Sequence, residues 1–158
     1  MEGDPFAKLR EVKITMTDVL EKKYKFITQA RKDHWKVCVY GLGYLGQRLY
    51  LSVPQIFGLS PDIYSDGNDE KVDTDGYDGL AGVYKRELLA LKEPVLVFVL
   101  ADNPADREIE KTLSENENLH IVLVREIIQM EETIRSFYGD ELYDKYVKLE
   151  EYSRKKAQ

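Results

Sequence analysis

Hydrophobic and polar positions alternate between strand-like and helix-like patterns along this chain. Apolar runs of strand length occupy residues 36–40, 95–100 and 119–124, and a shorter one lies at 62–65. Helical spacing of apolar residues follows them, at 44–57, 85–91, 105–116 and 125–137. This alternation predicts an α/β fold in which a Rossmann-like parallel sheet has helices on both faces. We expect the 36–40 strand to be central, with 62–65 on one side and 95–100, then 119–124, on the other.

The first strand ends on a glycine turn with the sequence GLGYLG. Gly41, Gly43 and Gly46 have the spacing G-x-G-x-x-G, which is typical of a strand–turn–helix unit that binds a pyrophosphate. We expect Gly41 to permit the tight turn, Gly43 to let the backbone approach the ligand, and Gly46 to let the helix pack close to the strand. Loss of Gly43 should weaken ligand binding most.

An acidic residue stands where such a unit holds ribose hydroxyls. Asp66 lies twenty residues after Gly46 and closes the second strand. The alternative is that the glycines only make a tight connection and that Asp66 is an ordinary surface residue.

The end of the strand at 95–101 should face the glycine turn across a crevice, because ligands of open α/β sheets bind beyond the carboxyl ends of the strands. Asp102 and Asn103 could equally cap the next helix. The candidate cofactor-binding residues are Gly41, Leu42, Gly43, Tyr44, Leu45, Gly46, Asp66, Gly67, Asn68, Ala101, Asp102 and Asn103. Catalytic residues stay unassigned. No metal site is expected, because His34 has no cysteine or second histidine nearby and the acidic residues at 66–75 lack a calcium-binding pattern.

The remaining segments complete the expected organisation. Residues 67–78 are polar and predict a loop, and 79–84 predict a bend with a short extended piece, so the third crossover is shortened. One long helix or two shorter ones are expected within 1–33, and another at 140–156. We therefore divide one domain into a helical extension (1–35), a Rossmann-like nucleotide-binding core (36–125) and C-terminal helices (126–158).

Composition excludes several classes of protein. The 158 residues suit a single domain, and the net charge of −6 argues against a nucleic-acid partner. The single cysteine, Cys38, lies in the predicted central strand and excludes a disulfide framework within one chain. Because we find no apolar run near 18 residues and no signal-type N-terminus, we expect no membrane insertion and a cytoplasmic location.

The order of these motifs resembles a particular Rossmann-like module. VCVYGLGYLG at 37–46, YSDGN at 64–68, LAGVY at 80–84 and the apolar strand at 95–101 are similar to domains of bacterial cell-surface polysaccharide biosynthesis. These include the N-terminal domains of PglD-like sugar acyltransferases and domains attached to some sugar methyltransferases. The resemblance covers residues 36–124 and implies a nucleotide-sugar on Gly41, Gly43, Tyr44 and Gly46. No hexapeptide repeat follows residue 124, so acyl transfer itself is not implied.

Three functions of different classes stay open. The first is a binding domain for a nucleotide or nucleotide-sugar, whose chemistry belongs to a partner transferase or another domain. The second is an NAD-dependent oxidoreductase or epimerase, and the third is a non-catalytic interaction domain that dimerises. We also expect NADP to bind worse than NAD, because Asp66 repels a 2′-phosphate and no arginine lies within 65–78.

The chain ends carry more apolar residues than a small sheet needs for coverage. We expect a homodimer through the terminal helices that leaves the glycine turn open. The expected contact residues are Phe6, Leu9, Ile27, Leu142, Tyr146 and Leu149. Packing of these helices on their own sheet, leaving a monomer, is the alternative.

Overall fold

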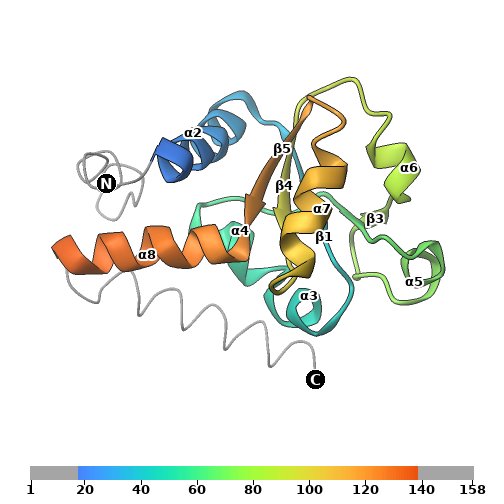
Figure 1. The fold of residues 1–158 in the computed structure, drawn as a ribbon. Helices are drawn as coiled ribbons and strands as arrows, with labels where there is room; N and C mark the ends of the chain where they lie inside the picture. The colour runs from blue at the N-terminus through green and yellow to red at the C-terminus, as the bar shows by residue number, and fades with distance from the viewer. Residues whose placement is uncertain (1–17, 139–158) are drawn as a thin grey trace.

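A five-stranded parallel sheet forms the centre of the protein, seen here in a computed structural model that describes residues 18–138 (Figure 1). The strands are β1 (Lys36–Tyr40), β2 (Ile63–Ser65), β3 (Ala81–Gly82), β4 (Val95–Val99) and β5 (Leu119–Leu123). Their order is β3-β2-β1-β4-β5, and all four pairings are parallel. The structure confirms the α/β fold, the central first strand and the neighbours expected on each side.

Seven helices within residues 18–138 surround this sheet. They are α2 (Asp18–Asp33), α3 (Tyr44–Leu49), α4 (Ser52–Ile56), α5 (Asp69–Thr74), α6 (Lys85–Leu88), α7 (Ala105–Leu113) and α8 (Val124–Tyr138). Figure 1 shows α2 and α8 near one another beside β5, and α5 and α6 at the opposite end near β3. The helix expected at 140–156 and the part of the N-terminal extension before residue 18 lie outside the described residues.

Alternate side chains of the central strands pack into two separate hydrophobic cores, one on each face of the sheet. Val37 and Val39 of β1 join one core together with apolar residues of α2, α3, α4 and α8. Cys38 and Tyr40 face the other way and join a second core with residues of α6 and α7. Because helices cover both faces, β1 and β4 are buried along nearly their whole length, and this explains their continuous apolar sequences.

A buried lysine attaches α2 to the rest of the domain. Lys23 is only 7% exposed, and its ammonium donates to a Glu110 carboxylate oxygen on α7 and to the Ile121 carbonyl of β5. It also lies 3.4 Å from a carboxylate oxygen of Glu126 on α8. A buried charge needs such partners, so α2 has a fixed position against three other elements.

Two segments differ from the sequence-based expectation. The loop expected at 67–78 contains α5, because the Asn68 side chain accepts from the backbone N–H groups of Glu70 and Lys71 and so caps a helix. The single helix expected at 44–57 is divided into α3 and α4. Pro54 has no N–H to donate to a carbonyl one turn earlier, so a continuous helix is interrupted near residue 50.

Within residues 18–138, no helix has both the length and the apolar composition needed to cross a membrane.

Candidate functional site

The strand register brings the ends of three strands to one edge of the sheet. Tyr40, the last residue of β1, lies beside Ser65 of β2 and Val99 of β4. The residues that follow these strands must therefore meet at the same edge. The helix after β1 packs on one face and α7, after β4, packs on the other, so the winding reverses between β1 and β4, where open α/β sheets bind their ligands.

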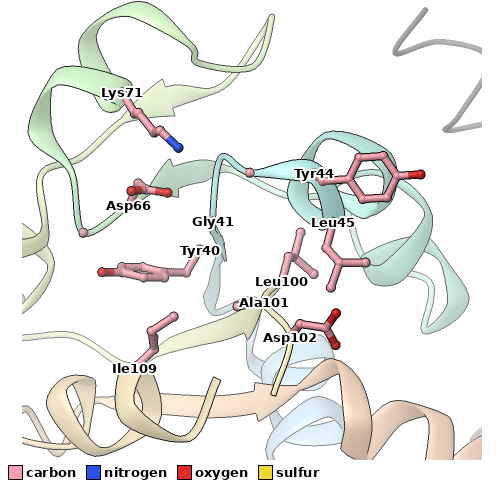
Figure 2. A pocket seen from close by; sticks show the side chains of 12 residues that line it. Tyr40, Gly41, Tyr44, Leu45, Asp66, Lys71, Leu100, Ala101, Asp102 and Ile109 are labelled. Carbon is pink, nitrogen blue, oxygen red and sulfur yellow. The ribbon is translucent and has the colours of Figure 1, made fainter. Parts of the chain in front are cut away.

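A cleft of about 460 Å³ opens at this position (Figure 2). This volume lies in the usual range for small-molecule sites. The cleft is lined by Tyr40, Gly41, Gly43, Tyr44, Leu45, Asp66, Gly67, Lys71, Leu100, Ala101, Asp102 and Ile109. It therefore joins the glycine turn, the end of β2 and the end of β4, as the sequence predicted.

The geometry of the turn gives each glycine a separate role. Gly41 has a φ of 126°, a conformation that residues with a Cβ rarely adopt. A Cβ on Gly46 would lie 2.1 Å from the carbonyl oxygen of Gly41, the residue that follows β1, so only glycine allows α3 to approach the chain so closely at the end of β1. Around Gly43, by contrast, an added Cβ would meet no atom within 4 Å. The structure confirms the mechanical roles of Gly41 and Gly46, and it places Gly43 at the open wall of the cleft.

Asp66 contacts the glycine turn directly. Its Oδ2 accepts a hydrogen bond of 2.8 Å from the Leu42 N–H, and its Oδ1 accepts one of 2.8 Å from the Asn68 N–H. Each carboxylate oxygen can accept a further bond. The carboxylate thus links β2, α5 and the turn, and it retains acceptor capacity on the cleft side.

Eight of the twelve predicted binding residues line the cleft, and four do not. Leu42 is buried in the hydrophobic core, and Gly46 lies beneath the turn against β1. Asn68 caps α5. Asn103 accepts a hydrogen bond of 2.7 Å from Nη2 of Arg125.

The segment after β4 is held by an arginine on α8. Besides Asn103, Arg125 donates to both carboxylate oxygens of the buried Asp106, each at 2.7 Å. The N-cap residue of α7 is Pro104, without a side-chain hydrogen bond, so neither Asp102 nor Asn103 fills that position. Asp102 is left at the cleft wall, opposite Asp66 (Figure 2).

Four lining residues are absent from the sequence-based set: Tyr40, Lys71, Leu100 and Ile109. Figure 2 shows the Lys71 ammonium extending from α5 toward the cleft on the side of Asp66. It forms no ion pair with any residue of the described chain. A lysine within a polar run gives no signal in the sequence, because only the unexpected helix α5 turns it toward the cleft.

Tyr40 adds a neutral hydroxyl to the same wall. Burial, and then the nearby Asp66 carboxylate, raise the pKa of Tyr40 to about 12. Its phenol therefore keeps its proton at neutral pH and can act as a hydrogen-bond donor.

The rim of the cleft carries an exposed aromatic ring. Tyr44, at the first position of α3, is 73% exposed, and the Arg48 guanidinium lies 4.9 Å from the centre of its ring. The Arg48 Nη1 also donates to the Tyr44 hydroxyl. Such an arrangement keeps one flat surface beside the glycine turn.

No group of three or more metal-ligating side chains occurs in the part of the chain that the structure describes. Comparison with protein-family models, with curated proteins and with solved structures gave no match.

Proposed function

We propose that this protein is a Rossmann-like binding domain for a nucleotide or a nucleotide-sugar. The observation that carries the proposal is the convergence of the glycine turn and Asp66 on one cleft, at the point where the winding of the sheet reverses. A phosphate group would lie against the turn near Gly43, and the ribose hydroxyls would lie toward Asp66.

The polar groups of the cleft suit such a ligand. Within residues 18–138, the backbone N–H groups of Gly43 and Tyr44 have no hydrogen-bond partner, so both remain able to donate to phosphate oxygens. The Lys71 ammonium supplies a positive charge on the same side. Leu45, Leu100 and Ile109 add apolar surface against which a sugar or base can pack.

Binding rather than chemistry is the proposed activity. No cysteine, histidine or serine is among the residues that line the cleft in the described structure. We assign no catalytic residue within residues 18–138, and we propose that the reaction belongs to a partner transferase or another domain. The resemblance to modules of bacterial surface polysaccharide biosynthesis makes nucleotide-sugars the first ligands to test.

Ligand-dependent thermal unfolding tests the proposal. The panel is NAD, NADP, UDP-sugars, CDP-sugars and S-adenosylmethionine, with uridine and adenosine as controls that lack phosphate. A ligand that binds only the folded state raises the midpoint, by an amount equivalent to about 2.7 kcal/mol at a hundredfold excess over Kd. We expect at least one nucleotide, and neither control, to raise it. A flat response to every nucleotide would contradict the proposal and favour a non-catalytic interaction domain.

A further inference from the structure

One peptide group of the glycine turn is held from both sides by side chains of the segment 66–77. The carbonyl oxygen of the peptide between Gly41 and Leu42 accepts a 2.7 Å hydrogen bond from the Tyr77 hydroxyl. The N–H of the same peptide donates to Asp66 Oδ2 at 2.8 Å. Because a peptide group is planar, fixing both polar atoms fixes its rotation. The turn therefore has one defined orientation where it lines the cleft.

Tyr77 is itself firmly placed. It is 5% exposed and stacks face to face on Tyr50, with ring centroids 4.0 Å apart and planes 1° from parallel. Tyr64 of β2 packs edge-on against it at 5.6 Å. Tyr50 is the C-cap residue of α3, so Tyr77 contacts the turn before this helix through its hydroxyl and the end of the helix through its ring.

The glycine at position 46 makes room for this contact. A Cβ on Gly46 would lie 2.5 Å from the Tyr77 hydroxyl as well as 2.1 Å from the Gly41 carbonyl oxygen. The third glycine of the motif thus accommodates the tyrosine hydroxyl in addition to the close packing of helix and strand. Burial raises the pKa of Tyr77, so its hydroxyl remains a donor at neutral pH.

We propose that Tyr77 and Asp66 form a clamp on the Gly41–Leu42 peptide, and that Tyr77 is a positioning residue for the nucleotide site. The clamp holds Gly43 where its backbone can receive a ligand phosphate. The effect on ligand binding rests on the proposed function, whereas the effect on the turn does not.

Amide hydrogen exchange of the ligand-free protein tests the clamp. Tyr77→Phe keeps the ring and its stack on Tyr50 but removes the hydroxyl. Loss of this bond should speed exchange of the Leu42 amide about tenfold, while the amides of β4 and β5 keep their rates. The matched control is Tyr84→Phe, which removes a hydroxyl that donates to Asp73, outside the turn. Unchanged Leu42 exchange in Tyr77→Phe would overturn the clamp.

Binding of UDP-glucose and NAD gives a second readout. If either probe binds the wild-type protein, Tyr77→Phe should weaken it about three- to tenfold, and Tyr84→Phe should not. Unchanged affinity in Tyr77→Phe would overturn the positioning role. If neither probe binds the wild type and the rest of the panel is also silent, the proposed function fails, and Leu42 exchange still decides on the clamp.

A second variant serves if Tyr77→Phe does not fold. Asp66→Ala removes both carboxylate oxygens, and with them the acceptors of the hydrogen bonds that the Leu42 and Asn68 N–H groups donate. Faster Leu42 exchange in this variant supports the clamp, and an unchanged rate contradicts it.

Discussion

The glycines of the motif have different surroundings. A substitution at one of them should therefore change ligand affinity, and a substitution at another should change stability. Gly43→Ala should leave the free energy of unfolding within about 0.5 kcal/mol of wild type, because the added methyl meets no atom within 4 Å. The methyl would stand in the cleft, so nucleotide affinity should fall roughly tenfold, equivalent to about 1.4 kcal/mol. Urea denaturation and calorimetric titration measure the two quantities.

Gly46→Ala is the matched counterpart. Its methyl would lie 2.1 Å from the Gly41 carbonyl oxygen, so we expect a loss of about 1–3 kcal/mol of stability. Equal stability of the two alanine variants would contradict this division of roles.

The charge of Lys71 should matter for phosphorylated ligands. Lys71→Ala is expected to weaken a nucleoside diphosphate about three- to tenfold at low salt, because the ammonium lies on the cleft wall and forms no ion pair within residues 18–138. Lys111→Ala, at an exposed position of α7 outside the cleft, is the control. Equal affinity of both variants and the wild type would remove Lys71 from the site.

The preference between NAD and NADP tests Asp66. We expect NADP to bind more weakly than NAD, because a 2′-phosphate would approach the Asp66 carboxylate. No arginine lies within 65–78, but the structure adds Lys71 to the same side of the cleft. Tighter binding of NADP, abolished by Lys71→Ala, would instead pair the 2′-phosphate with this lysine.

Residues that act through local backbone could be predicted from the sequence, and residues that act across the fold could not. The spacing of Gly41 and Gly46 is typical of a tight strand–turn–helix connection, so their structural roles could be predicted from the spacing alone. The Tyr77 hydroxyl donates a hydrogen bond to a carbonyl thirty-six positions away. Lys71 reaches the cleft from α5, in a polar segment whose sequence predicted a loop. Neither long-range contact leaves a pattern in the sequence.

Whole elements were predicted where burial imposes a continuous pattern. β1, β4 and β5 are buried on both faces and read as apolar runs. The helix α5 was missed because Val72 is its only buried residue, and its cap, Asn68, also suits a turn. β3 has only two paired residues, so its sequence indicates a bend more strongly than a strand.

The packing of β5 against the segment before β1 should make stability depend on pH. Burial, and then the charge of Lys22, lower the pKa of His120, whose ring stacks on Trp35 at 4.5 Å. As the pH falls through about 6.5, His120 is therefore protonated in the unfolded chain before it is protonated in the folded protein. The free energy of unfolding should decrease below that pH. Urea titrations at several pH values, followed by fluorescence of the single tryptophan, measure this slope.

Two histidine variants isolate the contribution. His120→Phe keeps an aromatic ring beside Trp35 and should flatten the slope between pH 5 and 7. His34→Asn is the matched control, because it removes the other histidine of the chain with a residue that tolerates the φ of 56° at this position. A slope unchanged by His120→Phe would contradict the assignment.

For the whole molecule, the structure reduces the set of residues that are expected to form the homodimer contact at the chain ends. Ile27, one of the expected contact residues, is fully buried in the domain's own core, so its face of α2 covers the sheet. The other expected contact residues lie outside the described part of the chain. Val19 on α2 and Ile128 on α8 remain partly exposed, at 58% and 43%.

From the sequence we predict a homodimer through the chain ends that leaves the cleft open. Light scattering at micromolar concentration should give twice the mass of the chain, and removal of residues 1–17 should reduce it. Deletion stops before α2, because that helix belongs to the core. A monomeric mass for the intact protein would defeat the prediction.

Cys38 is fully buried at the centre of β1, so the rate at which its thiol is alkylated reports how often the sheet opens. Burial raises the pKa of this thiol, and only the thiolate reacts with alkylating reagents, so modification must await opening of the sheet. Because the chain has one cysteine, the labelling rate counts openings of the core at a single known atom. A nucleotide at a hundredfold excess over Kd should slow that rate about a hundredfold. Ligands could thus be ranked under native conditions, without heat or urea.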